Sequence, residues 1–274
     1  MANPVASRRE KFSDPPLTWR FQVVNLKGKS KPGPETNAVE SAKLPVSHVA
    51  VIMDGNRRWA NKHHLPTVVG HKEGVKSLKR LVKHVGALKL NYLTVYAFSS
   101  ENWQRSEEEV GYLMQLFTDV LVDEVQELAE NKVRLRFIGQ KSTMPDKLRE
   151  RMEEACQETE KNSGLNLQVA INYGARQEIT EAAREIAIQV RDGKLSADQI
   201  DEALFSKHLY TAEIPDPELL IRTGGEMRIS NYLLWQSAYT ELYVTPALWP
   251  EFQPRHFDEA MREFSRRERR WGGD

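Results

Sequence analysis

The stretch HVAVIMDGNRRWA occupies residues 48–60, and the rest of the chain can be interpreted outward from it. Residues 49–53 form a short, almost wholly apolar run, which is typical of a strand buried on both faces of a sheet. Directly after this run come an aspartate, a glycine, two adjacent arginines and a tryptophan, namely Asp54, Gly55, Arg57, Arg58 and Trp59. Two arginines at the edge of a buried strand are hard to explain unless they serve a ligand, so we interpret the stretch as a strand that leads into a functional turn.

Outward from this strand, short apolar runs alternate with helical patterns. Strands are predicted at residues 92–98, 133–138 and 165–173, and helices at 75–88, 106–130, 146–161 and 177–191. Ser106 and Glu109 stand at the spacing of a helix-capping box. Strands separated by helices imply right-handed crossovers, so we expect a single α/β domain with a central, mostly parallel sheet flanked by helices. In such a sheet, ligands bind at the carboxyl ends of the strands.

The 274 residues divide into an extension and one large domain. Residues 1–43 hold five prolines and no sustained periodicity, so we expect a flexible N-terminal extension followed by a catalytic domain over residues 44–274. A cleaved organelle peptide, such as one for plastid import, is the weaker interpretation, because Glu10, Asp14 and Glu35 lie in a region that should be poor in acids.

The composition excludes several classes of protein. The 39 basic and 39 acidic side chains give a net charge of zero, which argues against a nucleic-acid binder that works by bulk attraction. Cys156 is the only cysteine, which excludes an internal disulfide framework and a CxxC metal or redox site. No apolar run approaches the ~18 residues of a membrane span, and the pattern of a secretory signal is missing. We therefore expect a cytoplasmic protein that does not bind nucleic acid.

Two further polar clusters follow predicted strands. Residues 99–105, SSENWQR, come after the strand at 92–98 and combine hydroxyls, an amide and Arg105. Residues 219–231, LLIRTGGEMRISN, pass from an apolar run to Arg222, two glycines, Arg228 and Ser230. Backbone amides freed by the glycines and flanked by two guanidinium groups predict a diphosphate cradle.

Two carboxylates and one histidine complete the candidate site. Asp54, at a strand end, is a natural Mg²⁺ ligand or base, and Glu241 is the second carboxylate near these arginines, so the two could share a Mg²⁺ site. His71 follows Gly70 at a predicted helix start, where an anion could bind, although an ordinary helix position explains it equally well. There is no serine or cysteine nucleophile with an obvious base. Many cations, few carboxylates and the wide apolar face of the helix at 106–130 together predict a substrate with a diphosphate and a hydrocarbon tail.

The three clusters, together with Gly70-His71 and the segment 96–103, resemble the cis-prenyltransferases from about Leu44 to Gly273. The resemblance implies an α/β fold with a hydrophobic tunnel, and Mg²⁺-dependent head-to-tail addition of isopentenyl diphosphate to an allylic diphosphate primer in Z configuration. It implies a homodimer, in which the C-terminal Arg270 of an Arg-x-Gly segment binds in the partner's active site. The implied product is a polyprenyl diphosphate of the undecaprenyl type, with peripheral membrane contact for its release.

The resemblance also assigns roles to residues. Asp54 would hold Mg²⁺ on the allylic diphosphate, residues 55–58 would cradle that diphosphate, and His71 would assist its departure. Arg222, Arg228 and Ser230 would grip isopentenyl diphosphate, and Glu241 would complete the metal site. The remaining candidates for substrate binding are Asn56, Trp59, Ser99, Ser100, Glu101, Trp103, Arg105 and Ile229.

Asn102 stands where the family is usually assigned its proton acceptor. Because an amide is a poor base, we expect Asn102 to orient isopentenyl diphosphate while the released diphosphate takes the proton. Thr67 is a departure, since many members carry an arginine a few residues before the Gly-His pair. In this family, bulk at the tunnel floor sets the length of the product, and the candidates by position are Leu113, Leu116, Phe117, Leu165 and Ile171.

Three other functions remain open on the sequence. A short-chain Z-prenyl diphosphate synthase would share every motif. A non-catalytic partner subunit of a heteromeric enzyme should lack the turn at Asp54, which is intact here. A phosphate-ester hydrolase would use Asp54 as its nucleophile and would release inorganic phosphate.

Overall fold

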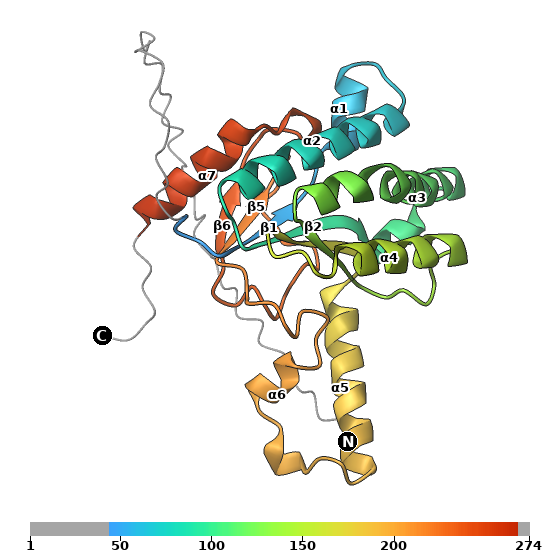
Figure 1. Ribbon diagram of the computed structural model, residues 1–274, viewed down its shortest axis with the longest axis vertical. Helices are drawn as coiled ribbons and strands as arrows, with labels where there is room; N and C mark the ends of the chain where they lie inside the picture. Colours follow the sequence, from blue (N-terminus) through green and yellow to red (C-terminus); the bar gives the residue numbers. More distant parts are fainter. Residues whose placement is uncertain (1–43, 268–274) are drawn as a thin grey trace, which may run out of the picture. The chain divides into compact units, whose positions relative to one another are not determined.

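The computed structural model describes residues 44–267 (Figure 1). The predicted N-terminal extension, residues 1–43, and the predicted partner-site residue Arg270 lie outside the described residues.

Within residues 44–267, six strands form one parallel sheet in the order β3-β4-β2-β1-β5-β6. The strands are β1 (His48–Ile52), β2 (Tyr92–Ser99), β3 (Arg134–Ile138), β4 (Asn166–Tyr173), β5 (Leu219–Arg222) and β6 (Glu241–Val244). The predicted fold class is confirmed. Every strand pair is parallel because each connection returns the chain to the amino edge of the sheet before the next strand begins. Helices form the connections as far as β5, and the irregular segment 223–240 connects β5 to β6.

The helices are α1 (Asn56–Lys62), α2 (Thr67–Ala87), α3 (Glu107–Glu130), α4 (Asp146–Thr159), α5 (Ala175–Arg191), α6 (Glu202–Ser206) and α7 (Pro254–Arg266). Short 3₁₀ helices lie at η1 (Ser100–Gln104), η2 (Ala197–Gln199) and η3 (Trp249–Glu251). Ser106 caps α3 as predicted, since its hydroxyl accepts a hydrogen bond from the Glu109 amide at 3.3 Å.

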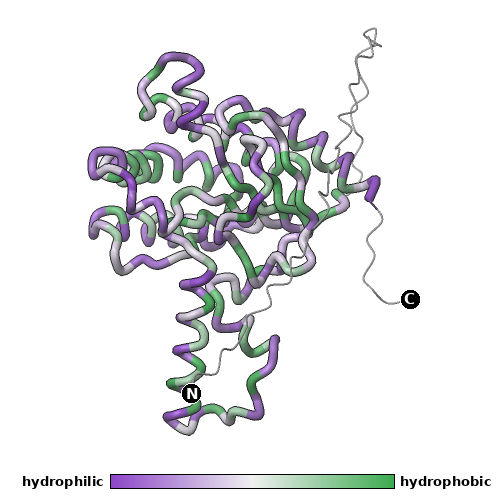
Figure 2. The backbone as a smooth tube through the Cα atoms, turned by 180° about the vertical axis from the view of Figure 1, so that it is seen from behind, coloured by the Kyte–Doolittle hydropathy of each residue, from purple (hydrophilic) through white to green (hydrophobic). Residues whose placement is uncertain are grey.

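Successive residues of β1 point to opposite faces of the sheet and belong to different cores. Val49 and Val51 pack in the larger core with residues of α2 and α7, whereas Ala50 and Ile52 pack with Tyr173 on the opposite face. All five residues of β1 are buried, which accounts for the continuous apolar run in the sequence. Apolar residues gather in the central strands, and the outer turns of the helices are polar (Figure 2).

A row of buried polar side chains crosses the sheet at the start of β1. His48 Nδ1 lies 2.6 Å from the Pro215 carbonyl oxygen, and His48 Nε2 lies 2.7 Å from Thr94 Oγ1. The Thr94 hydroxyl is also hydrogen-bonded to Gln168 Oε1 at 2.9 Å. Burial lowers the pKa of His48 to about 4, so the ring is neutral at pH 7. Within residues 44–267, no helix is long and apolar enough to cross a membrane.

Candidate active site

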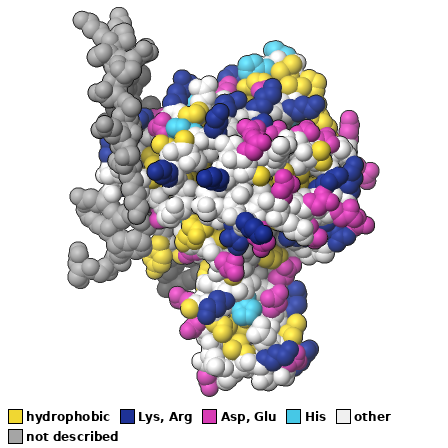
Figure 3. All heavy atoms as spheres, in the orientation of Figure 1, with side chains coloured by type: hydrophobic (Ala, Val, Ile, Leu, Met, Phe, Trp, Pro, Cys, Tyr) yellow, Lys and Arg dark blue, Asp and Glu magenta, His cyan; other side chains and the backbone are white. Residues whose placement is uncertain are grey.

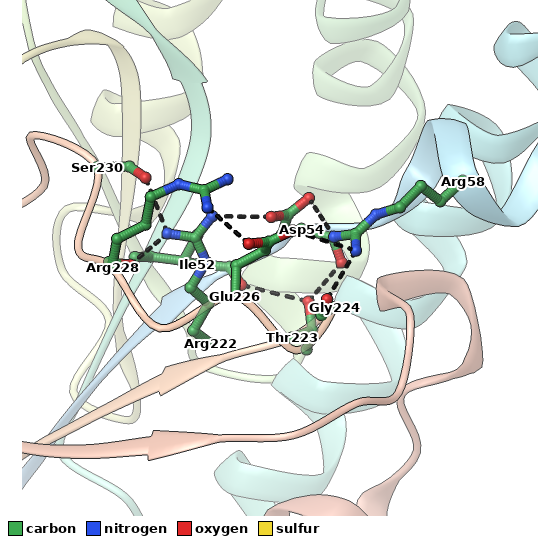
Figure 4. Close-up of polar contacts among 9 residues, drawn as sticks. All are labelled: Ile52, Asp54, Arg58, Arg222, Thr223, Gly224, Glu226, Arg228 and Ser230. Atoms are coloured by element: carbon green, nitrogen blue, oxygen red, sulfur yellow. Dashed lines mark hydrogen bonds and ion pairs between the residues drawn. The ribbon is translucent and has the colours of Figure 1, made fainter. Parts of the chain in front are cut away.

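The polar cluster that follows β1, residues 54–59, is the first cluster. It meets the third cluster, residues 219–231, at the carboxyl edge of the sheet. Ile52, the last residue of β1, is level with Arg222, the last residue of β5, so Asp54 and Arg222 emerge side by side. Asp54 Oδ2 accepts a hydrogen bond from Arg222 Nη2 at 2.8 Å, and Asp54 Oδ1 lies 3.1 Å from Arg58 Nη2 (Figure 4). The backbone of Asp54 is fixed as well, because the Thr223 hydroxyl donates to its carbonyl oxygen at 2.6 Å.

These two arginines determine the charge of Asp54. Burial alone would raise the pKa of this carboxyl group, but the hydrogen bonds from Arg222 and Arg58 outweigh burial and hold its pKa below the ordinary value. Asp54 is therefore ionised at neutral pH. A permanently ionised carboxylate suits a cation ligand and does not suit a general acid.

Arg222 is the most deeply buried cation of the site, with a side chain only 3% exposed. Besides Asp54, its guanidinium group donates from Nη1 to Ser230 Oγ at 2.8 Å and to the backbone carbonyl oxygen of Arg228. Ser230 has a positive φ of 48°, which turns the loop after β5 back over the arginine. Three acceptors therefore fix the position and plane of this guanidinium group.

The two glycines after β5 have a different role from the predicted one. The Gly224 amide donates to the Ala247 carbonyl oxygen at 2.8 Å, and the Gly225 amide donates to the Thr245 carbonyl oxygen at 2.9 Å. The prediction that these amides cradle a diphosphate is wrong, because they bind the segment that follows β6. Instead Gly224, at φ +83°, lets Arg58 approach. Arg58 Nη1 donates to the Gly224 carbonyl oxygen at 2.7 Å, and a Cβ atom at Gly224 would lie only 2.3 Å from Arg58 Nη2.

Two glutamates that the sequence did not single out as site residues pair with its arginines. Glu226 Oε2 lies 2.6 Å from Arg228 Nη1, and Glu226 Oε1 lies 3.7 Å from Arg58 Nη1. Glu109 Oε1 lies 2.9 Å from Arg105 Nη1. Glu226 was visible inside the third cluster, but Glu109 was interpreted only as part of a helix cap. Among the described residues, the cleft therefore interleaves both signs of charge.

The second cluster is joined to the third by an asparagine that the sequence analysis did not assign. Asn231 Nδ2 donates to Glu101 Oε1 at 2.8 Å, and the Glu101 carboxylate also accepts from the Ser100 hydroxyl at 3.2 Å. Asn102 Oδ1 accepts from the Ser99 amide at 3.0 Å and so closes the first turn of η1. The amide oxygen of Asn102 is thus engaged locally, which leaves its NH₂ group for a ligand.

Trp103 is held by a second unassigned asparagine, Asn172. The indole Nε1 donates to Asn172 Oδ1 at 2.7 Å, and Asn172 Nδ2 donates to the Gln140 carbonyl oxygen at 2.7 Å. Asn172 is 3% exposed and has a positive φ of 50°. It lies in the irregular end of β4, next to the shifts in register between β2 and β4, which no local sequence pattern indicates.

His71 lies in the second turn of α2 rather than at its start, because the helix begins at Thr67. The predicted anion site at a helix start is therefore wrong for this residue. His71 Nε2 lies 3.6 Å from Glu109 Oε1 and has no hydrogen-bond partner within the described residues. Burial, and then the nearby charge of Arg105, lower the pKa of His71 despite Glu109. The ring is therefore neutral at pH 7.

The other predicted residues near β1 surround its carboxyl end. Gly55 precedes α1 at φ +117°, Arg57 is exposed in the first turn of α1, and Trp59 packs its ring 4.5 Å from the ring of His63. Asn56 faces a cavity, and its buried Oδ1 atom has no partner among the described residues. Ile229 packs against the core that contains Ile52, so it supports the site.

Glu241 lies at the opposite edge of the sheet from Asp54. It is the first residue of β6 and is level with Leu219, at the amino end of β5, whereas Asp54 follows the carboxyl end of β1. Five residues of strand separate the two levels, a distance of roughly 16 Å. Glu241 instead accepts a hydrogen bond from Arg267 Nη1 at 2.8 Å. The predicted Asp54–Glu241 pair is not formed within one chain, and the described residues contain no cluster of three metal-ligating side chains.

An apolar cavity of about 480 Å³ begins beside the site and runs between α2, α3 and the sheet. Met53, Asn56 and His71 line its beginning. Four of the predicted tunnel residues line it, namely Leu113, Leu116, Phe117 and Ile171. Leu165 does not line the cavity, because it precedes β4 at the amino edge of the sheet and packs in the larger core.

Comparison with known proteins agrees with this geometry. Residues 52–272 match a prenyltransferase family model described as "Putative undecaprenyl diphosphate synthase". An isoprenyl transferase of Heliobacterium mobile is 47% identical over 86% of this chain and 90% of its own length. A ditrans,polycis-undecaprenyl-diphosphate synthase of Vibrio parahaemolyticus, described as specific for (2E,6E)-farnesyl diphosphate, is 47% identical over 85% of this chain and 92% of its own.

A solved structure shares the fold. The lavandulyl diphosphate synthase of Lavandula x intermedia, crystallised with dimethylallyl diphosphate, superposes with a TM-score of 0.81 at 38% identity, over 83% of this chain and 98% of that one. The family model and the relatives each span most of the chain, and the fold and the order of the motifs agree with them. The chain therefore belongs to the undecaprenyl diphosphate synthase family, the cis-prenyltransferases.

Proposed function

We propose that this enzyme condenses isopentenyl diphosphate head-to-tail with an allylic prenyl diphosphate and forms a polyprenyl diphosphate in Z configuration. The observation that carries the proposal is the position of Asp54 and its arginines at the mouth of an apolar cavity. Arginines recognise diphosphate oxygens, and the cavity accepts a hydrocarbon tail. The name of the Vibrio relative supports a primer of the farnesyl diphosphate class.

The two diphosphates bind on opposite sides of Asp54 in this proposal. The allylic diphosphate binds at residues 55–58, because from there its tail enters the cavity beside Asn56 and His71. Isopentenyl diphosphate binds at Arg228 and Ser230 next to the fixed guanidinium group of Arg222. Arg105, the last residue of the second cluster, pairs with Glu109 and contributes to the rim.

Mg²⁺ fits this set of donors. It is usually bound by one or two carboxylates together with substrate phosphates rather than by a cage of protein ligands. Asp54 is one ionised carboxylate beside two proposed phosphate sites, so Asp54 and the diphosphate oxygens would hold the ion. When bound, Mg²⁺ supplies charge neutralisation for the departing diphosphate.

The residues of the chain provide the rest of the chemistry. The bond between the primer's C1 and its diphosphate oxygen breaks, C4 of isopentenyl diphosphate bonds to C1, and C2 of isopentenyl diphosphate loses a proton. Arg58 stabilises the charge that develops on the leaving diphosphate. The neutral ring of His71 donates a hydrogen bond rather than a positive charge. The NH₂ group of Asn102 orients isopentenyl diphosphate, and the released diphosphate takes the proton.

We further propose that the enzyme is a cytoplasmic homodimer whose product passes to a membrane surface. Arg270, which lies outside the described residues, would contribute to the partner's active site through the C-terminal Arg-x-Gly segment. Trp59 and Trp103 would shape the entrance where the new bond forms.

One incubation separates this proposal from its alternatives. The purified chain is mixed with Mg²⁺, radiolabelled isopentenyl diphosphate and allylic primers of several lengths, and label that butanol extracts is counted and sized. We expect labelled polyprenyl product from the chain alone. Absence of product would refute the proposal, and product only after a second subunit is added would identify a partner subunit. Inorganic phosphate with a phosphorylated Asp54 would identify a hydrolase.

A further inference from the structure

The cavity is too small for a long product. A cavity of ~150 Å³ holds the six carbons of benzene, so on the same scale about 480 Å³ holds roughly nineteen carbons, or about four isoprene units. The undecaprenyl chains named for the relatives have eleven units and need nearly three times that volume. A product longer than about four units therefore requires either that one wall of the cavity moves or that the tail leaves between α2 and α3 at the exposed distal end.

The wall that can move is the junction of α2 and α3. The sheet forms another wall through β4 residues such as Leu167 and Val169, which are fixed by strand pairing on both sides. The helices α2 and α3 lie side by side over the sheet (Figure 1). Over these helices, the surface presents basic and acidic side chains close together (Figure 3).

An ion-pair cluster joins the two helices over the cavity. Lys79 of α2 places its Nζ atom 2.5 Å from Glu124 Oε2 and 3.0 Å from Glu127 Oε2, and both glutamates belong to α3. All three residues line the cavity. The hydrogen bonds that the Lys79 ammonium group donates to the two carboxylates raise the pKa of Lys79, so the cluster stays charged well above neutral pH.

Beyond this cluster the cavity continues to an exposed position on α2. Lys79 lies eight residues along α2 from His71, and Gly86 lines the cavity seven residues farther on. Gly86 is exposed, and among the described residues a Cβ atom built there would meet no atom within 4 Å outside its own stretch of helix, so the cavity opens to the surface at this point. A growing chain that passes the cluster therefore reaches open space at the distal end of the helices.

We propose that Lys79, Glu124 and Glu127 form an ionic latch that joins α2 to α3 over the cavity, and that the strength of this latch determines how many isoprene units are added. The inference rests on the proposed prenyl transfer and deepens it. A growing tail pushes the helices apart, and the latch opposes their separation. Two exposed ion pairs of this kind shift an equilibrium by about two- to thirty-fold, which is enough to change a product distribution without abolishing synthesis.

The test compares two lysine-to-methionine variants on the same helix. Lys79→Met keeps a long side chain but removes the latch, whereas Lys76→Met removes a lysine whose partner is Glu73 of the same helix and which does not line the cavity. Products made from labelled isopentenyl diphosphate and farnesyl diphosphate are sized by chromatography. We expect the ratio of longer to shorter products to rise about two- to thirty-fold in Lys79→Met and to stay at the wild-type value in Lys76→Met.

Charge reversal and salt give independent checks. Lys79→Glu should lengthen the products as Lys79→Met does, and the triple variant that adds Glu124→Lys and Glu127→Lys should restore the wild-type distribution. In 1 M NaCl the Debye length falls to ~3 Å, so wild-type products should lengthen while those of Lys79→Met change little. Products of Lys79→Met that are unchanged or shorter would overturn the proposal.

Amide hydrogen exchange separates failure of the latch from failure of the proposed reaction. Backbone amides around Lys79 and Glu124 should exchange faster in Lys79→Met than in Lys76→Met, and this measurement needs no substrate. If even the wild-type chain incorporates no isopentenyl diphosphate, the proposed function fails, and the exchange data still show whether the cluster holds the helices together. Equal exchange in the two variants would overturn the latch even if the reaction proceeds.

Discussion

Replacing Arg222 with lysine keeps the charge of the most buried cation and removes its planar fork. In the structure the guanidinium group donates to Asp54 Oδ2 and Ser230 Oγ, each at 2.8 Å, and to the Arg228 carbonyl oxygen. The lysine side chain is shorter and ends in a single ammonium group, so it cannot keep all three contacts while it also binds a diphosphate. The loss of one hydrogen bond to a charged group costs about 1.5–3 kcal/mol, which corresponds to a fall of about 10- to 150-fold in kcat/KM.

The assay measures initial rates of incorporation at saturating primer while isopentenyl diphosphate is varied, so that KM and kcat are resolved. We expect most of the loss in KM for isopentenyl diphosphate, because Arg222 lies on the side of Asp54 where that substrate is proposed to bind. The matched control is Arg136→Lys on β3, whose ion pair with Glu213 lies at the far edge of the sheet. Circular dichroism verifies folding of both variants. A loss of less than three-fold for Arg222→Lys would refute the argument that the fork positions the substrate.

Three other predictions follow from named contacts. Asp54→Ala should lower kcat by at least ~10³-fold at saturating Mg²⁺, because the metal's charge stabilisation is worth several kcal/mol. Single-turnover measurements test this, and a loss of only a few-fold would contradict the metal assignment. Gly224→Ala places a methyl group only 2.3 Å from Arg58 Nη2 and displaces the guanidinium group, so it should weaken primer binding by no more than Arg58→Ala does. The double variant should be no worse than Arg58→Ala alone, and multiplied losses would show that the two sites act separately. The pKa of His48 is about 4 in the folded chain against 6.5 as its ordinary value, so the unfolded state takes up the proton first as the pH falls. Urea unfolding should therefore show about 3 kcal/mol of stability lost between pH 6.5 and pH 4 in the wild type and less in His48→Gln, and equal pH dependence in the two would contradict this.

The strands were predictable because a parallel sheet buries both faces of each strand. The strand predicted from the apolar run at 49–53 is β1, which begins and ends one residue earlier than that run. The helix predicted at 106–130 begins at Glu107, after its Ser106 cap. The helix α1 was interpreted as a turn, since Ala60 is its only buried residue and it offers no apolar stripe. By contrast, α7 was not predicted although it could have been, because its buried residues Phe257, Ala260, Met261 and Phe264 recur at helical spacing in the sequence.

The site was predictable to the extent that topology determines it. Clusters that follow parallel strands must meet at one edge, and Asp54 and Arg222 do. The same rule places Glu241 away from Asp54, because a residue that begins a parallel strand lies at the amino edge of the sheet. That conclusion required only the sequence. The positions of Asn172 and Asn231 could not be predicted in this way, since both depend on positive φ angles in irregular backbone.

Pairing between arginines and carboxylates explains how so many cations occupy one cleft of a chain with zero net charge. The pairs differ in burial, and this difference determines which of them a diphosphate can displace. Arg222 is 3% exposed and would leave Asp54 only at the cost of an uncompensated buried charge, whereas the Glu226 side chain is 40% exposed and can return to water. Glu226 contacts Arg58, where the primer diphosphate is proposed to bind, and Arg228, where isopentenyl diphosphate is proposed to bind. If the two diphosphates bind as proposed, one that displaces Glu226 from either arginine alters its hold on the other, and we expect the occupancies of the two substrate sites to be coupled through this carboxylate.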